Sequence, residues 1–176
     1  PKFVPADGVV IELKDAVSLK VRMVDCVGYI VDGALGHEEN GKQRLVSTPW
    51  SKDAMTFDEA AEIGTKKVIR DHSTIGVVVI TDGSVTGIER GSYIEAEERV
   101  IDELKSMNKP FVVILNSLTP KDEKTEILRN ELEEKYEVPI LPVNVEQMEE
   151  PDIENILETV LYDFPLNEIR INISKW

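Results

Sequence analysis

Four residues have types and spacings suited to chemistry on a phosphorylated ligand. Asp25 and Gly28 form an Asp-x-x-Gly segment after a strand-like stretch, and Asn116 and Ser117 follow an apolar run. In enzymes that transfer phosphoryl groups, a carboxylate at a strand end holds Mg²⁺, and a nearby glycine lets its backbone N–H approach the γ-phosphate. Asp25 is therefore a candidate metal ligand, and Asp25 with Gly28 a candidate catalytic pair. An ordinary strand-ending turn uses the same residue types and is the alternative.

The second pair opens the stretch Asn116-Ser117-Leu118-Thr119, which stands where GTPases carry Asn-Lys-x-Asp to recognise guanine. A carboxylate at the fourth position accepts two hydrogen bonds from guanine, and the Thr119 hydroxyl lacks both the charge and the paired acceptors. We expect Asn116 and Ser117 to bind the base of a nucleotide, with ATP preferred to GTP. The alternative is that Asn116 only braces its own turn.

The phosphate-cradling loop of P-loop NTPases does not occur in the 176 residues. They contain no Gly-x-x-x-x-Gly-Lys-Ser/Thr motif, so they supply no lysine to the β- and γ-phosphates and no hydroxyl to the Mg²⁺ shell. We expect these residues alone to be inactive toward a nucleotide. The chain starts at Pro1 without a methionine and stops after a strand-like segment, and we therefore expect a piece of a longer protein.

Charge and composition limit the kinds of ligand and partner that this chain can bind. Acidic residues outnumber Lys and Arg 34 to 20, which gives a formal net charge of -14. Such a field repels nucleic acid, whereas a single nucleotide can still bind through backbone N–H groups. Cys26 and two distant histidines offer no zinc site, and we expect Cys26 to be a small buried residue. No apolar run reaches the length of a membrane span, which predicts a cytoplasmic protein without direct membrane contact.

The residues before the first regular helix predict a hairpin and a long loop. Apolar residues alternate over 17–23 and follow a first apolar segment at 9–13, which predicts an antiparallel hairpin with one buried face. The stretch 31–55 keeps no period and predicts a loop. Trp50 either anchors this loop to the core or contacts a partner, and anchoring is the commoner role of a loop aromatic.

Later elements follow at regular spacing. The predicted strands are 75–80, buried on both faces, 111–115, also buried, 138–143, at an edge of the sheet, and 169–173. Helices are predicted before and between these strands. In chain order, the helices begin at the capping box Thr56 and Glu59, at the capping box Ser92 and Glu95, at Thr119-Pro120 and at Pro151. This alternation predicts an α/β fold, with a mostly parallel sheet, helices on both faces and the β-hairpin at the start. Ligands of such a sheet bind beyond the carboxyl ends of its strands.

Longer blocks of sequence resemble one family. The chain is similar over its whole length to the stage IV sporulation A proteins, the ATPases of the spore-coat basement layer in endospore-forming bacteria. The blocks that carry the resemblance are 1–5, 24–29, 39–41, 48–50, 59–65, 72–78 and 93–101.

The resemblance implies that residues 1–165 are a truncated NTPase-like domain of the translation-factor GTPase type, whose P-loop strand and first switch segment lie upstream. Residues 166–176 would be a strand leading into a C-terminal region. ATP and Mg²⁺ are the implied cofactors, with Asp25 on the Mg²⁺ side, Gly28 at the γ-phosphate and the Asn116 segment as a degenerate base loop. In that class the P-loop strand lies between the strand ending at Asp25 and the strand at 75–80, so we expect both to have open edges here.

The same resemblance implies an activity and partners for the full-length protein. ATP hydrolysis would drive self-assembly into a static polymer around the forespore, in the mother-cell cytoplasm. The partners would be further copies of the protein, a small amphipathic membrane peptide and other coat morphogenetic proteins, held through regions outside these residues. The competing hypothesis is a non-catalytic module that keeps the NTPase scaffold as an interaction surface.

Overall fold

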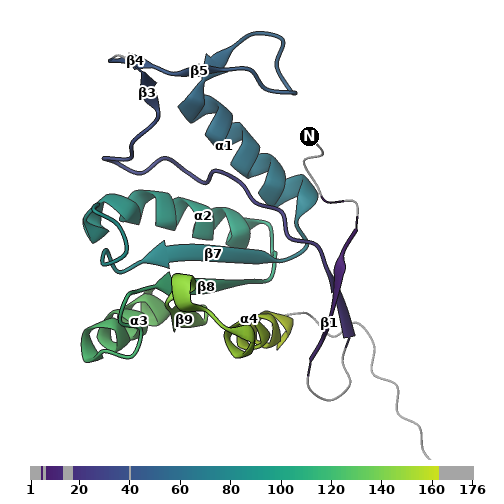
Figure 1. The fold of residues 1–176 in the computed structure, drawn as a ribbon, viewed down its shortest axis with the longest axis vertical. Helices are drawn as coiled ribbons and strands as arrows, with labels where there is room; N and C mark the ends of the chain where they lie inside the picture. The colour runs from purple at the N-terminus through teal and green to yellow at the C-terminus, as the bar shows by residue number, and fades with distance from the viewer. Residues whose placement is uncertain (1–4, 6, 14–17, 40, 163–176) are drawn as a thin grey trace, which may run out of the picture.

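A three-stranded parallel sheet forms the centre of the computed structural model, which describes residues 5, 7–13, 18–39 and 41–162 (Figure 1). Its strands are β7 (Gly76–Thr81), β8 (Phe111–Asn116) and β9 (Ile140–Val143), in the order β7-β8-β9. Helices α2 (Ile94–Ser106) and α3 (Glu123–Tyr136) make the two crossover connections. The predicted alternation of strands and helices is confirmed over this part of the chain.

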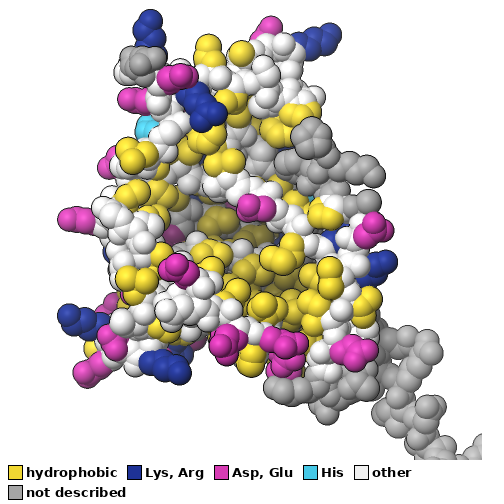
Figure 2. All heavy atoms as spheres, viewed as in Figure 1, with side chains coloured by type: hydrophobic (Ala, Val, Ile, Leu, Met, Phe, Trp, Pro, Cys, Tyr) yellow, Lys and Arg dark blue, Asp and Glu magenta, His cyan; other side chains and the backbone are white. Residues whose placement is uncertain are grey.

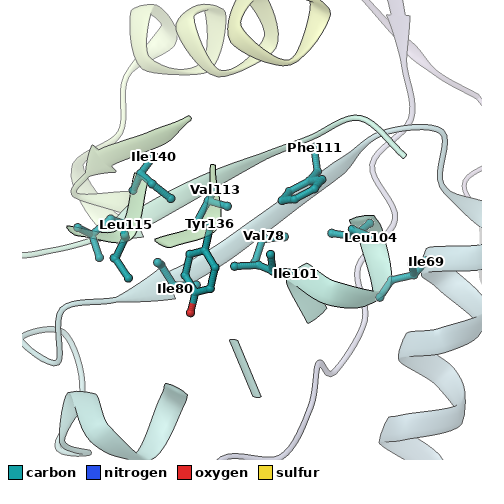
Figure 3. Close-up of a cluster of buried hydrophobic side chains, with 11 residues drawn as sticks. Ile69, Val78, Ile80, Ile101, Leu104, Phe111, Val113, Leu115, Tyr136 and Ile140 are labelled. Carbon is teal, nitrogen blue, oxygen red and sulfur yellow. The ribbon is translucent and has the colours of Figure 1, made fainter. Parts of the chain in front are cut away.

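Helices cover both faces of the sheet, as predicted. Helices α2 and α3 pack on one face, where Figure 3 shows Tyr136 of α3 beside side chains of β7 and β8. Helix α4 (Glu150–Tyr162) packs on the other face through Ile156 and Val160. The residues of the larger cluster are Ile69, Val78, Ile80, Ile101, Leu104, Phe111, Val113, Leu115, Leu132, Tyr136 and Ile140. Among the described residues, no helix is both long and apolar enough to cross a membrane.

The first two strands form a hairpin that is separate from this sheet. Strand β1 (Val9–Glu12) pairs antiparallel with β2 (Ser18–Val21), with Val9 opposite Val21, which confirms the predicted hairpin. The predicted buried face is present only in part: Leu19 and Val21 are half-buried between exposed Ser18 and Lys20, whereas Met23 is 84% exposed. Within the described part of the chain the hairpin pairs only with itself.

The stretch predicted as a structureless loop carries short strands. They form two antiparallel pairs, β3 (Glu38–Glu39) with β4 (Lys42–Gln43) and β5 (Leu45–Val46) with β6 (Met55–Thr56). Trp50 lies against α1 (Phe57–Lys67) at Gly64, so its predicted anchoring role is confirmed.

The capping box that opens α1 is confirmed. The Thr56 hydroxyl accepts from the Glu59 N–H at 3.2 Å, and the Glu59 carboxylate accepts from the Thr56 N–H at 3.1 Å. A π-helical turn η2 (Val68–His72) follows α1 directly.

Two predicted helix starts are wrong. The Ser92 capping box does not form, because a 3-10 turn η3 (Arg90–Tyr93) leads into α2 without a side-chain cap. Helix α3 begins after Asp122 rather than at Thr119-Pro120. A short 3-10 turn η4 (Val145–Gln147) follows β9, and the strand predicted at 169–173 lies outside the described residues.

Strand β7 departs from the prediction that it is buried on both faces. Val78 and Ile80 are buried under α2, whereas Val77 and Val79 are 48% and 58% exposed. Helix α4 packs on β8 and β9, and β7 is the edge of the described sheet. Figure 2 shows apolar side chains gathered in a hollowed area over β7 and α4. The expected open edge is therefore present on β7.

The direction of each β7 amide predicts its exchange rate. Gly76 N–H donates to the Pro110 carbonyl at 3.0 Å across the β8 side. Because N–H directions alternate along a strand, Val78 and Ile80 also face β8, whereas Val77 and Val79 face the free edge.

We predict that in the isolated 176-residue chain the Val77 and Val79 amides exchange roughly tenfold or more faster than the Val78 and Ile80 amides. Amide-resolved hydrogen exchange by NMR measures this, with β8 as the internal reference. In a longer form of the protein, a strand paired at this edge should slow Val77 and Val79. Uniformly slow exchange of all four amides in the monomeric chain would show that the edge is not free.

Candidate functional site

The Asp25–Gly28 segment follows β2 without regular secondary structure and runs across the molecule between α1 and α2 (Figure 1). The Asp25 side chain is exposed, and its Oδ1 accepts the N–H of Cys26 at 2.8 Å. Gly28 has φ +82°, a conformation that side-chain-bearing residues rarely adopt, and open space surrounds the position of a Cβ. The segment thus presents a carboxylate and a glycine on an accessible surface.

A hollow of about 300 Å³ lies between this segment and α1. It is lined by Asp25, Cys26 and Val27 together with Trp50, Ala60, Ala61 and Gly64. Cys26 is exposed, so its predicted burial is wrong. The reason is local: the segment lies over small side chains of α1 and is not part of the sheet.

The carboxyl end of β7 carries a network of polar groups. Thr81 Oγ1 accepts the Gly83 N–H at 3.0 Å, and Asp82 Oδ1 accepts both the N–H and the hydroxyl of Ser84, at 2.9 and 2.6 Å. Burial alone raises the pKa of Asp82, but hydrogen bonds from the Ser117 and Ser84 hydroxyls and the Ser84 N–H outweigh it and hold the pKa below its ordinary value. Asp82 is therefore ionised at neutral pH.

The carboxyl end of β8 is tied to its neighbours through Asn116 and Ser117. Asn116 Oδ1 accepts the Val145 N–H at 3.1 Å, which joins β8 to the turn after β9. Ser117 is fully buried, and its hydroxyl accepts the Thr119 N–H at 3.1 Å and lies 3.3 Å from Thr125 Oγ1. Both side chains hold loops in place, and contact of either residue with a base stays a prediction.

The predicted site residues lie at two separate places, Asp25 and Gly28 near α1 and Asn116 and Ser117 at the end of β8. Asn116 lines a second hollow of about 190 Å³ with Thr81, Thr86 and Tyr93. Ser84 connects the ends of β7 and β8, since its Oγ accepts the Leu118 N–H at 3.0 Å. Asp25 lines the separate hollow against α1.

Sequence reasoning placed ligands beyond the strand ends but assigned no role to Asp82 or Ser84, which follow the strand predicted at 75–80. An acidic residue directly after a buried apolar run was the available signal. It also missed the buried ion pair of Arg90 with Glu97, at 2.7 Å, which Tyr136 completes by donating its hydroxyl to Glu97 at 2.6 Å. This network fixes the loop after β7 to α2 and α3.

Asp25 fits a magnesium ion only as one part of a larger shell. Mg²⁺ commonly takes one or two protein carboxylates and completes its octahedron with water and phosphate oxygens. Within the described ranges no group of three or more His, Cys, Asp and Glu side chains could hold a metal ion. The exposed Asp25 carboxylate therefore suits an ion that arrives with its own oxygen ligands.

A parallel sheet between helices, with polar loops beyond the carboxyl ends of its strands, defines an open α/β domain, a class whose ligands bind at those ends. A family model described as "Stage IV sporulation protein A, ATPase domain" matches residues 1–165, and the chain belongs to this family.

Curated relatives match the chain over its full length. It is 76% identical to stage IV sporulation protein A of Clostridioides difficile (strain 630) over all 176 residues. It is 48% identical to the proteins of the same name from Bacillus subtilis (strain 168) and Bacillus anthracis. In each case it spans 36% of the relative's length.

The Asn116 contact predicts a local effect of substitution. Asn116→Ala removes the acceptor for the Val145 N–H, so exchange of the Val145 amide should rise by roughly fivefold to tenfold, the equivalent of about 1 kcal/mol. Asn116→Asp keeps an acceptor and should preserve most of the protection. Asn144→Ala is the matched control, because it removes the analogous acceptor for Glu146 instead. Unchanged Val145 exchange in Asn116→Ala would mean that this contact does not brace the loop.

Proposed function

We propose that the chain is the greater part of the ATP-hydrolysing domain of a longer sporulation protein. The match of an ATPase-domain family model to residues 1–165 is the observation that carries this proposal. The position of Asp25 and Gly28 after the hairpin, on an accessible surface, supports it. The fold class behind the proposal is the translation-factor GTPase type, with a P-loop strand from outside these residues filling the open edge of β7.

In this proposal the residues of the chain have distinct tasks. Asp25 holds Mg²⁺ through a carboxylate oxygen, and the Gly28 N–H donates to the γ-phosphate. The metal supplies positive charge that neutralises the negative charge developing during phosphoryl transfer. The open space around Gly28 supports the approach of a phosphate. The chain alone is inactive, since the 176 residues contain no phosphate-cradling motif.

The end of β8 provides the base loop. Thr119 is exposed at the position where guanine-specific proteins carry an acidic residue. Asn116 and buried Ser117 hold that loop against Val145 and Thr125. Because Thr119 lacks a carboxylate, the loop cannot accept the two guanine hydrogen bonds that give GTP its advantage, and ATP is the nucleotide of this domain.

The biological role we propose follows the family. ATP hydrolysis drives self-assembly of the full-length protein into a static polymer at the base of the spore coat, on the mother-cell side of the forespore surface. A small amphipathic membrane peptide and other coat proteins are the proposed partners, through regions outside this chain. The net charge of -14 supports the absence of nucleic acid among the partners.

A non-catalytic interaction module is the second candidate. It is favoured by one observation, the lack of a Gly-x-x-x-x-Gly-Lys-Ser/Thr motif in the 176 residues. Assays on the full-length gene product and on the isolated chain separate the two candidates, because only the catalytic candidate predicts turnover in the longer protein.

Asp25→Asn in the full-length protein should lower ATP turnover roughly tenfold to a hundredfold while affinity for ATP changes much less, since the metal-held charge matters most in the transition state. Steady-state kinetics and nucleotide-binding calorimetry measure the two quantities. Asp32→Asn, an exposed acidic residue a few positions further on, is the matched control and should leave both unchanged. Undiminished turnover in Asp25→Asn would show that Asp25 is an ordinary turn residue without a role in hydrolysis.

Thr119→Asp should shift nucleotide preference toward GTP by roughly tenfold, because the new carboxylate can accept the two guanine hydrogen bonds. Competition binding in the full-length protein gives the ratio of affinities. Leu118→Asp is the control, since it adds the same charge at an adjacent, half-exposed position. Equal ratios in the two variants would show that Thr119 does not face the base.

A further inference from the structure

Tyr29, the residue directly after Gly28, is fixed to helix α2 by two contacts. Its hydroxyl donates a hydrogen bond to Glu103 Oε2. The guanidinium carbon of Arg99 lies 4.2 Å from the centre of its ring, a cation–π distance. Burial, and then the bond to Glu103, raise the pKa of Tyr29, so the phenol stays a protonated donor.

Arg99 extends this contact to helix α1. Its Nη2 lies 2.5 Å from Glu62 Oε1, and its Nε lies 4.0 Å from Glu103. Glu62 also pairs with Lys66 at 2.8 Å. Glu62 of α1, Arg99 and Glu103 of α2, and Tyr29 of the segment that runs between the two helices are linked by these contacts. We call these four residues the Tyr29 latch.

The latch holds a stretch that has little else to hold it. Among the described residues, 22–28 form one hydrogen bond, the local one between the Cys26 N–H and Asp25. Gly28 has a left-handed conformation, and open space surrounds the position that a Cβ would take. With no strand pairing and one local hydrogen bond in this stretch, the place of Asp25 and Gly28 over α1 depends on where Tyr29 is held.

The latch is poorly suited to a purely stabilising role. Arg99 and Glu62 are about 40% exposed, and ion pairs of this exposure contribute little to stability. Removing Arg99 also strands no charge, because Glu62 keeps Lys66 and Glu103 keeps the Tyr29 hydroxyl.

We propose that Tyr29 and Arg99 are positioning residues that hold the Asp25–Gly28 segment in register with α1 and α2 for phosphoryl transfer. The catalytic part of this inference rests on the proposed function. The mechanical part, that the latch sets the position of the segment, stands on the contacts alone.

The test uses the full-length protein with two readouts. The first is the backbone mobility of residues 26–31, measured as NMR relaxation of their amides, and the second is kcat and KM for ATP. Arg99→Ala should raise the mobility of that segment and lower kcat about tenfold with KM nearly unchanged. Tyr29→Phe keeps the ring under the guanidinium but loses the hydroxyl, so it should give a smaller change in the same direction. Arg99→Lys keeps the charge and should restore part of the loss.

Arg129→Ala is the matched control. Arg129 lies between Glu126 and Glu133 on α3, at 3.0 and 3.1 Å, in an arrangement similar to that of Arg99 between its two glutamates. It has no contact with Tyr29, so its loss should leave the mobility of residues 26–31 and kcat at wild-type values. A thermal melt of every variant reports folding, and Tyr29→Phe serves where Arg99→Ala is unfolded.

The two readouts separate failure of the latch from failure of the proposed function. Wild-type mobility at 26–31 in both Arg99→Ala and Tyr29→Phe would overturn the latch, whatever the kinetics. Raised mobility together with a lowered kcat, and no further loss of kcat when Asp25→Asn is combined with Arg99→Ala, would support it in full. Raised mobility with unchanged kcat would overturn the positioning role in catalysis and leave the mechanical role standing.

Discussion

Parallel pairing of β8 with both of its neighbours is the interaction on which the rest of the domain depends. All five residues from Phe111 to Leu115 are buried, and the strand carries apolar side chains to both helix layers. Since parallel strands end at the same edge, this pairing brings the ends of β7, β8 and β9 together. The polar contacts of Asp82, Ser84, Asn116 and Val145 are a consequence of that alignment.

The Asp25 segment is placed by a different means. It belongs to no strand of the central sheet, so backbone pairing does not fix it, and side chains of α1 and α2 do so instead. A half-exposed cluster with an aromatic ring and ion pairs is weaker than a buried strand. The candidate phosphate segment is therefore the part of the site that can shift most easily, while the candidate base loop is held firmly by buried groups such as Ser117.

Much of the fold could be predicted from the sequence, because local patterns carried it. The capping box at Thr56, the apolar runs of β7 and β8 and the proline-containing edge strand β9 each have a mechanism that acts within a few residues. The features that the sequence did not predict depend on contacts between residues that are distant in the sequence. The runs of β7 and β8 look alike, and the exposure of Val77 and Val79 follows from the absence of a neighbouring strand among the described residues. The contact of Tyr29 with Glu103 joins residues 74 positions apart and leaves no local signal.

The central claim is that Asp25 and Gly28 form the metal and γ-phosphate end of an ATP site in the full-length protein. A crystal structure of that protein with Mg²⁺ and a non-hydrolysable ATP analogue tests it most directly. The account predicts Mg²⁺ about 2.1 Å from the Asp25 carboxylate or one water molecule away, with the γ-phosphate within hydrogen-bonding distance of the Gly28 N–H. A nucleotide bound with its γ-phosphate and metal remote from the Asp25–Gly28 segment would contradict it.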